Sequence, residues 1–147
     1  MTTSGRPIVE ITRRETFAAA HRLWSSTLTD DQNRKLYGPC AYDYGHGHNY
    51  VMEITLRGPV DPATGILVNL TEIRDATREL ILEDVDHRHL NHDSELVRGI
   101  NPTAENLVVL FWTILERRFG PLLHEVCLQE TEKNWVRYRG DRAPDGA

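Results

Sequence analysis

Alternation of apolar and polar residues predicts two half-buried β-strands in the first part of the chain. The first covers 8–16, where β-branched residues alternate roughly with polar ones, and it runs into the alanine segment before His21. The second covers 50–57, and the apolar side chains that share one of its faces are Met52, Ile54 and Leu56. Each strand therefore has one face suited to a hydrophobic core.

Further strands are predicted after a turn at 61–65 and near the C-terminal end. In this turn a proline sets φ and a glycine supplies a positive φ, so we expect the short apolar stretch 66–69 to return as a partner strand. A last hairpin is expected from 125–131 and 135–139.

Two amphipathic helices are predicted between these strands. Thr71 can cap the first helix, which runs to about Glu83, and the second begins at 102–103 and ends before Gly120. The segment 23–39 reads as a loop with one short helical turn, where a threonine and a glutamine have capping-box spacing. The order strand, strand, helix, helix, strand, strand predicts an α+β fold, with a four-stranded antiparallel sheet and two helices on one face. The edges of such a sheet must be paired or protected, and edge pairing between copies is one solution.

Composition and charge narrow the class of protein. We expect one domain over 1–147, with a tail at about 141–147 that has nothing to bury and is frayed. No apolar run approaches the ~20 residues of a membrane span, and 1–7 has no signal-peptide core, so no membrane partner is expected. Two cysteines cannot form a disulfide scaffold, which favours a reducing, cytoplasmic location. The net charge of −5 argues against nucleic acid as a partner.

Three histidines and a cysteine are the candidate residues for a metal site and its chemistry. His46 and His48, at i and i+2 on extended backbone, project from one face, so both imidazoles can reach one metal ion. With His21 they would form a set of three neutral ligands, which leaves zinc an open coordination position as in catalytic sites. Cys40, nearby in sequence, adds a possible base or nucleophile. Taken singly, each of these residues has an ordinary reading as a satisfied polar side chain or an inert thiol.

Beyond the histidines, the chain carries seven short motifs, in order, that together resemble the 6-pyruvoyltetrahydropterin synthase family. They are Phe17-Ala18-Ala19-Ala20-His21-Arg22-Leu23, Tyr37-Gly38-Pro39-Cys40, Gly45-His46-Gly47-His48-Asn49-Tyr50, Val60-Asp61-Pro62-Ala63-Thr64-Gly65, Asn69-Leu70-Thr71, Val85-Asp86-His87-Arg88-His89-Leu90 and Gln129-Glu130-Thr131. The resemblance implies the tunnelling fold, in which three chains close a barrel and two barrels stack as a hexamer. Active sites of this family lie between subunits.

The resemblance also implies roles for individual residues. The zinc ligands map onto His21, His46 and His48, and the catalytic cysteine maps onto Cys40. Asp86 and His87 would complete a proton relay, and Glu130 would grip the pterin ring. Thr103-Ala104-Glu105 stands where many members have Thr-Thr-Glu, so Thr103 and Glu105 are the expected further contacts to the pterin and one hydroxyl is missing. His89, His92 and His124 are expected at the surface, and Cys127 and the two tryptophans Trp112 and Trp135 are expected to be structural.

The implied activity is a lyase reaction on 7,8-dihydroneopterin triphosphate. The open zinc position would bind side-chain hydroxyls, Cys40 would remove a proton, triphosphate would leave, and an internal redox shift would give 6-pyruvoyltetrahydropterin for tetrahydrobiopterin synthesis. Zinc has no redox chemistry, and no dinucleotide fingerprint is present, so no nicotinamide cofactor is expected.

Three alternatives stay open. The first is a 6-carboxytetrahydropterin synthase of the queuosine pathway. Five residues between Cys40 and His46 favour the pyruvoyl activity, whereas Asn101-Pro102-Thr103 resembles the queuosine type. The second is a zinc- and pterin-binding module without turnover. The third is a cysteine hydrolase built from Cys40, His87 and Asp86.

Overall fold

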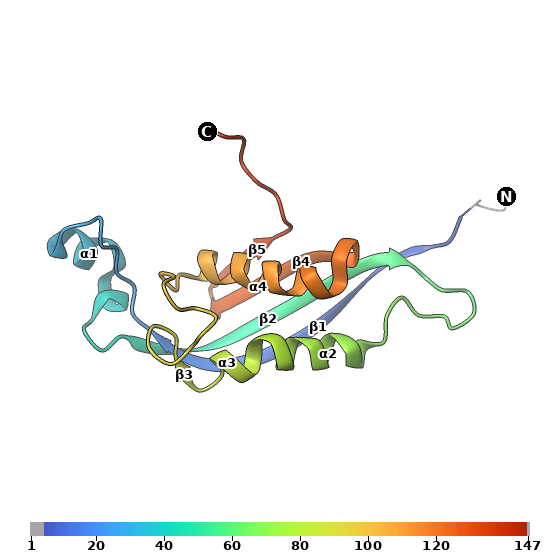
Figure 1. Cartoon of the computed structure of the whole chain (residues 1–147), viewed down its shortest axis with the longest axis horizontal. Coiled ribbons are helices and arrows are strands. Elements are labelled where there is room, and N and C mark those ends of the chain that lie inside the picture. Colours follow the sequence, from blue (N-terminus) through green and yellow to red (C-terminus); the bar gives the residue numbers. More distant parts are fainter. Residues whose placement is uncertain (1–4, 147) are drawn as a thin grey trace.

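The computed structural model describes residues 5–146 and consists of one twisted β-sheet with helices packed on one of its faces (Figure 1). The strands are β1 (Ile8–His21), β2 (His46–Pro59), β3 (Arg88–His89), β4 (Leu123–Thr131) and β5 (Asn134–Tyr138). The helices are α1 (Asp30–Tyr37), α2 (Leu70–Thr77), α3 (Glu83–Val85) and α4 (Ala104–Phe119). Helices on one face of a largely antiparallel sheet confirm the predicted α+β class.

The sheet has five strands in the order β3-β1-β2-β4-β5, so the prediction of four strands was wrong. The additional strand, β3, has two residues and runs parallel to β1, opposite Ala19 and Ala20. Two residues are too few to show an alternating pattern, and their pairing depends on where the preceding helix ends. The other pairs are antiparallel, as expected.

The stretch 66–69 does not form the predicted return strand. It closes a loop in which the amide of Asp61 donates to the carbonyl of Ile66 over 3.0 Å. Leu67 packs directly over Gly58, where a Cβ atom would lie 2.7 Å from the leucine methyl. The apolar character of this stretch thus reflects a side chain that covers the sheet and not a strand.

The two main helices begin at side-chain caps. Asn69, and not the predicted Thr71, caps α2, because its side-chain oxygen accepts from the amide of Thr71 at 3.0 Å. A π-helical turn over 78–82 joins α2 to α3, so the helical segment runs to Val85. Thr103 caps α4. The predicted short helix in 23–39 is α1, and both hydrogen bonds of its capping box are present.

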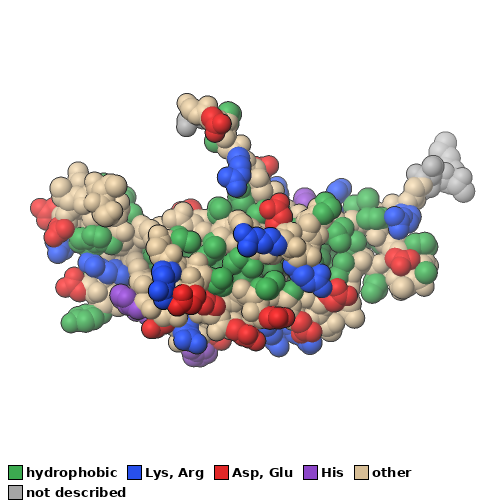
Figure 2. Space-filling model, in the orientation of Figure 1, with side chains coloured by type: hydrophobic (Ala, Val, Ile, Leu, Met, Phe, Trp, Pro, Cys, Tyr) green, Lys and Arg blue, Asp and Glu red, His purple; other side chains and the backbone are tan. Residues whose placement is uncertain are grey.

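The core lies between the sheet and the helices α2 and α4 (Figure 1). Phe17 of β1 stacks on Tyr50 of β2 with ring centroids 4.7 Å apart, and Phe111 of α4 meets Phe17 edge-on. Figure 2 shows acidic and basic side chains intermixed over this side of the molecule. No helix among the described residues is long and apolar enough to cross a membrane.

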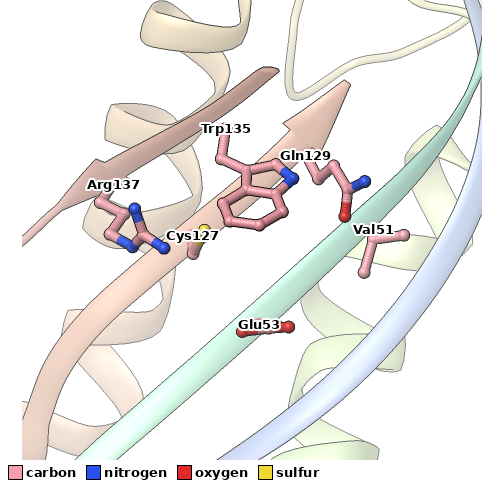
Figure 3. A pocket seen from close by; sticks show the side chains of 6 residues that line it. All are labelled: Val51, Glu53, Cys127, Gln129, Trp135 and Arg137. Atoms are coloured by element: carbon pink, nitrogen blue, oxygen red, sulfur yellow. The ribbon is translucent and has the colours of Figure 1, made fainter. Parts of the chain in front are cut away.

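No helix of residues 5–146 covers the opposite face of the sheet (Figure 1). A small pocket there is lined by residues of β2, β4 and β5 (Figure 3), namely Val51, Glu53, Cys127, Gln129, Trp135 and Arg137. Cys127 is buried in it, on the face opposite Glu130, as the alternation along β4 predicted. Trp112 is 7% exposed and packs in the core, as its expected structural role requires, whereas Trp135 is 56% exposed and does not pack in the core.

Candidate metal centre and active site

The three predicted histidines meet at one end of the sheet, where β1 ends and β2 begins. The antiparallel register places His21 directly opposite His46, and His48 shares a face with both. Nε2 of His48 lies 3.1 Å from Nε2 of His21 and 3.2 Å from Nε2 of His46. Zn–N bonds of about 2.0–2.1 Å place tetrahedral ligand atoms roughly 3.3 Å apart, so this spacing fits a zinc ion.

His21 is held in place from its far side. Its Nδ1 donates to the carbonyl of Pro102 at 2.9 Å, which leaves the lone pair of Nε2 facing the other histidines. The phenol oxygen of the buried Tyr50 lies 3.2 Å from the same Nδ1. A carbonyl partner of this kind fixes both the tautomer and the ring orientation of a metal-ligating histidine.

Burial favours the neutral form of all three imidazoles. Desolvation lowers the pKa of His21 to about 4, and it also lowers the pKa values of His46 and His48. Neutral imidazoles carry the lone pairs that a metal needs. The donor set therefore matches a metal that accepts nitrogen ligands.

Gly45 allows β2 to begin so close to the end of β1. Its φ of +70° lies in the left-handed region, and a Cβ atom at this position would collide with the carbonyl of His21. The glycine before the His-x-His pair is thus required for the histidines to meet.

Glu130 brings a carboxylate to the histidines from the end of β4. One of its oxygens lies 3.1 Å from Nε2 of His48 and 3.9 Å from Nε2 of His21. Burial raises the pKa of Glu130, with a further contribution from the charge of Glu105, while His46 opposes the shift. The structure thus brings together two of the predicted pterin contacts, Glu130 and Glu105.

These two carboxylates line a pocket of about 440 Å³ between the start of α4 and the β4–β5 hairpin. Its remaining lining residues are Ala104, Lys133, Asn134, Trp135 and Val136. Thr103 directly precedes this segment, and its hydroxyl accepts from the amide of Asn106 at 3.1 Å. Two acidic groups in one pocket suit a ligand rich in N–H donors.

Cys40 lies in the short 3₁₀ turn Gly38–Ala41, beside the histidines. Its sulfur, a ring nitrogen of His21 and one of His46 all lie within 4.8 Å of one another. Burial raises the pKa of the thiol, and the charge of Glu130 raises it further. The structure thus places Cys40 near the histidines. Because its pKa is raised, the thiol needs a nearby positive charge to ionise at neutral pH.

Asp86 and His87 contact each other, and His87 lines one pocket together with His48 of the histidine centre. Nδ1 of His87 lies 2.9 Å from a carboxylate oxygen of Asp86, and that oxygen also accepts from the amide of Ala18 at 2.9 Å. The side chain of His87 is 83% exposed, on a residue with φ of +60°. Among residues 5–146, no hydrogen bond or ion pair joins this pair to Cys40.

Tyr50 and Pro102 are parts of the site that the sequence did not predict. Tyr50 could have been found, because it follows His48 by two residues on the same face of one strand. The carbonyl of Pro102 carries no local signal, since any residue has one and only the tertiary fold brings it to His21.

Together, the one-sided sheet and the cluster of three histidines with an adjoining thiol and carboxylate define an α+β protein with a candidate catalytic metal centre. The family model of 6-pyruvoyl tetrahydropterin synthase matches residues 10–141, and the chain belongs to this family. The chain is 44% identical over 139 residues to the 6-pyruvoyl tetrahydrobiopterin synthase of Drosophila melanogaster. This match covers 93% of this chain and 83% of that protein.

The chain is also similar to a solved structure and to a protein named for a second activity. The structure of Caenorhabditis elegans 6-pyruvoyl tetrahydropterin synthase matches with a TM-score of 0.86 and 38% identity, covering 92% of this chain and 98% of that one. A 6-carboxy-5,6,7,8-tetrahydropterin synthase of Rickettsia bellii is 31% identical over 117 residues, which are 69% of this chain and 76% of that protein.

Proposed function

We propose that this protein is a zinc-dependent 6-pyruvoyltetrahydropterin synthase that acts on 7,8-dihydroneopterin triphosphate and releases triphosphate. The observation that carries the proposal is the cluster of three Nε2 atoms, with neighbouring atoms 3.1 and 3.2 Å apart, beside Cys40 and Glu130. Membership of the family and the names of relatives at 38–44% identity support the same activity. A cytoplasmic location stays a prediction.

His21, His46 and His48 are the residues that would hold the zinc ion. When bound there, zinc supplies Lewis-acid polarisation of the substrate's side-chain oxygens and a positive charge that favours ionisation of the nearby thiol. The chain's own contribution is to keep the imidazoles neutral by burial and to fix His21 through Pro102.

Substrate binding is assigned to the pocket beside Glu130. The carboxylates of Glu130 and Glu105 accept hydrogen bonds from N–H groups of the pterin, and Thr103 offers its hydroxyl proton while its oxygen caps α4. Ala104 contributes no hydroxyl there. These contacts orient the substrate side chain toward the histidines.

Proton transfer is assigned to Cys40. As a thiolate it removes a proton from a side-chain carbon of the substrate, and the triphosphate leaves with the electrons of its C–O bond. The remaining hydrogens of the side chain are redistributed onto the pterin ring, so no external oxidant or reductant takes part.

The proton relay through Asp86 and His87 is assigned to a contact between subunits. The side chain of His87 is exposed, while its Nδ1 is bound to Asp86, so Nε2 is directed away from its hydrogen-bonded neighbour. We place this group against Cys40 of another copy of the chain. Such an arrangement makes a homo-oligomer part of the proposed function.

An unpaired stretch of β1 supports oligomerisation. Among the described residues, β3 pairs only with Ala19 and Ala20, so β1 presents a free backbone edge over 8–17. The strand β5 is the other edge of the sheet. Long free edges are paired, covered or protected in stable proteins, and pairing them between copies would close a barrel without edges. The proposed assembly is a hexamer of two such trimers.

The test is mass spectrometry of the products that zinc-loaded protein forms from 7,8-dihydroneopterin triphosphate, with and without a chelator. We expect pyruvoyl tetrahydropterin and free triphosphate, lost on chelation and restored by zinc. Carboxytetrahydropterin and acetaldehyde as products would instead indicate a 6-carboxytetrahydropterin synthase. Bound pterin without turnover would indicate a binding module, and chelator-resistant hydrolysis would indicate a cysteine hydrolase.

The variant Cys40→Ala tests whether Cys40 acts as the catalytic base or as a zinc ligand. We expect this variant to retain its zinc content, because the three histidines are unchanged, and to lose turnover. Full turnover in Cys40→Ala would remove the thiol from the mechanism.

A further inference from the structure

The two residues that follow His21 hold the turn that carries Cys40. The amide of Leu23 donates to the carbonyl of Cys40 at 2.7 Å, and Nε of Arg22 donates to the carbonyl of Ala41 at 3.2 Å. Two adjacent carbonyls of the turn are thus bound by two adjacent residues. The position of Cys40 relative to the histidines depends on this connection, since Arg22 directly follows the ligand His21.

Arg22 is itself fixed on both its backbone and its side chain. The side-chain amide of Asn91 accepts from the amide of Arg22 at 2.7 Å and donates to its carbonyl at 2.8 Å. The guanidinium lies 4.1 Å from the centroid of the Trp24 ring, and a terminal nitrogen lies 3.5 Å from a carboxylate oxygen of Asp43. With its side chain 28% exposed, Arg22 spans the gap between β1 and the Cys40 turn.

We propose that Arg22 is a positioning residue that sets the place of Cys40 relative to the three histidines. Its planar guanidinium is suited to this role, because stacking on Trp24 fixes the plane in which Nε donates to the turn. The catalytic consequence rests on the proposed function, whereas the effect on the turn does not. The competing assignment for an arginine at this place is direct contact with a substrate phosphate.

Two variants separate these assignments. Arg22→Lys keeps the positive charge but lacks the fixed Nε donor and the stacking plane, and Arg22→Met lacks the charge as well. Arg34→Lys is the matched control, because Arg34 also lies near the Trp24 ring, at 5.9 Å, and its side chain makes no hydrogen bond to the turn among the described residues. All three variants are compared as the zinc-loaded chain of residues 1–147, and their thermal midpoints, which we expect to be equal, are measured alongside.

The first readout is hydrogen–deuterium exchange without substrate. We expect the amide of Leu23 and those of 38–45 other than Pro39 to exchange about fivefold or more faster in both Arg22 variants, because the turn opens more often once its connection to β1 is lost. Arg34→Lys should exchange like the unchanged protein. Zinc content should stay the same in all variants, since no histidine is altered. Unchanged exchange in both Arg22 variants would overturn the inference.

The second readout is turnover. We expect Arg22→Lys to lower kcat by roughly tenfold or more with little change in KM, since displacement of a proton-transfer group slows the chemical step. Full kcat in Arg22→Lys together with a raised KM in Arg22→Met would assign Arg22 to a substrate phosphate instead. If the unchanged protein showed no turnover at all, the proposed function would fail, and the exchange measurement would still decide the positioning role.

Discussion

At the scale of single residues, the site depends on a buried histidine that has to remain neutral. The pKa of His21 is lowered from 6.5 to about 4 by burial. Between these two pH values the imidazole is protonated in the unfolded chain but stays neutral in the folded chain. The stabilising effect of neutral His21 is complete above pH 6.5 and is lost as the pH falls toward 4.

We therefore expect the free energy of unfolding of the metal-free protein to fall by about 3 kcal/mol from this residue as the pH drops from 7 to 4. Urea denaturation at a series of pH values measures the slope. His21→Gln, which cannot titrate, should show a flatter dependence by that amount. Equal slopes in the two proteins would show that His21 is not buried as a neutral imidazole.

Gly45 is the second residue on which the site depends, because its missing Cβ lets β2 begin against the carbonyl of His21. Gly65→Ala is a matched control: φ there is +75°, but no atom lies within 4 Å of the added Cβ. We expect Gly65→Ala to cost about 1 kcal/mol, from its left-handed backbone alone.

Gly45→Ala should cost clearly more than Gly65→Ala and should also weaken zinc binding, because relief of the collision displaces His21. Chemical denaturation and competition with a coloured zinc chelator measure the two effects. Equal losses in the two variants would contradict the close approach of β1 and β2 at this point.

At the scale of elements, α4 begins at a residue that has two assigned roles. The Thr103 hydroxyl caps the helix and is a proposed pterin contact, whereas Thr29 caps α1 and has no proposed role in binding. We expect Thr103→Ala and Thr29→Ala each to lower the free energy of unfolding by about 1 kcal/mol.

Only Thr103→Ala should raise KM for the pterin substrate, because only Thr103 directly precedes Ala104 and Glu105, which line the proposed pterin pocket. Steady-state kinetics at a temperature where both variants are folded measure this difference. An unchanged KM in Thr103→Ala would restrict the residue to its capping role.

At the scale of the whole molecule, the free edge of β1 predicts how copies associate. Ala18 exchanges hydrogen bonds with the 86–87 segment at the outer edge, so the backbone groups of alternate residues before it, including Arg14, also point outward. A proline at position 14 removes an outward amide and keeps the pairing with β2.

We expect Arg14→Pro to dissociate the oligomer into folded monomers, measured by sedimentation velocity and circular dichroism. Arg13→Pro is the control, since it removes an amide that faces β2 and should unfold the chain. An oligomer that survives in Arg14→Pro would show that β1 is not the edge through which copies pair.

Much of the fold and of the site could be predicted from local pattern. The period of two in 8–16 and 50–57 gave the first two strands, and Thr29 with Gln32 gave the cap of α1, because these signals lie within a few neighbouring residues. Spacing alone placed His46 and His48 on one face; His21 and Cys40 were candidates from their residue types, and the family resemblance implied their roles. The predicted strand at 66–69 was wrong, because an apolar run has the same local pattern whether it pairs or only covers a sheet.

The sequence by itself thus determined the periodicities, the caps and the residue types of the site. Tertiary structure alone decided that β3 pairs with β1, that Glu130 reaches His48 and that the Pro102 carbonyl holds His21. It also decided that Asp86 and His87 form an exposed pair with no hydrogen bond or ion pair to Cys40 among residues 5–146. The physical reason is that periodicity and capping are interactions between near neighbours, whereas register, burial and pKa depend on residues that only folding brings together.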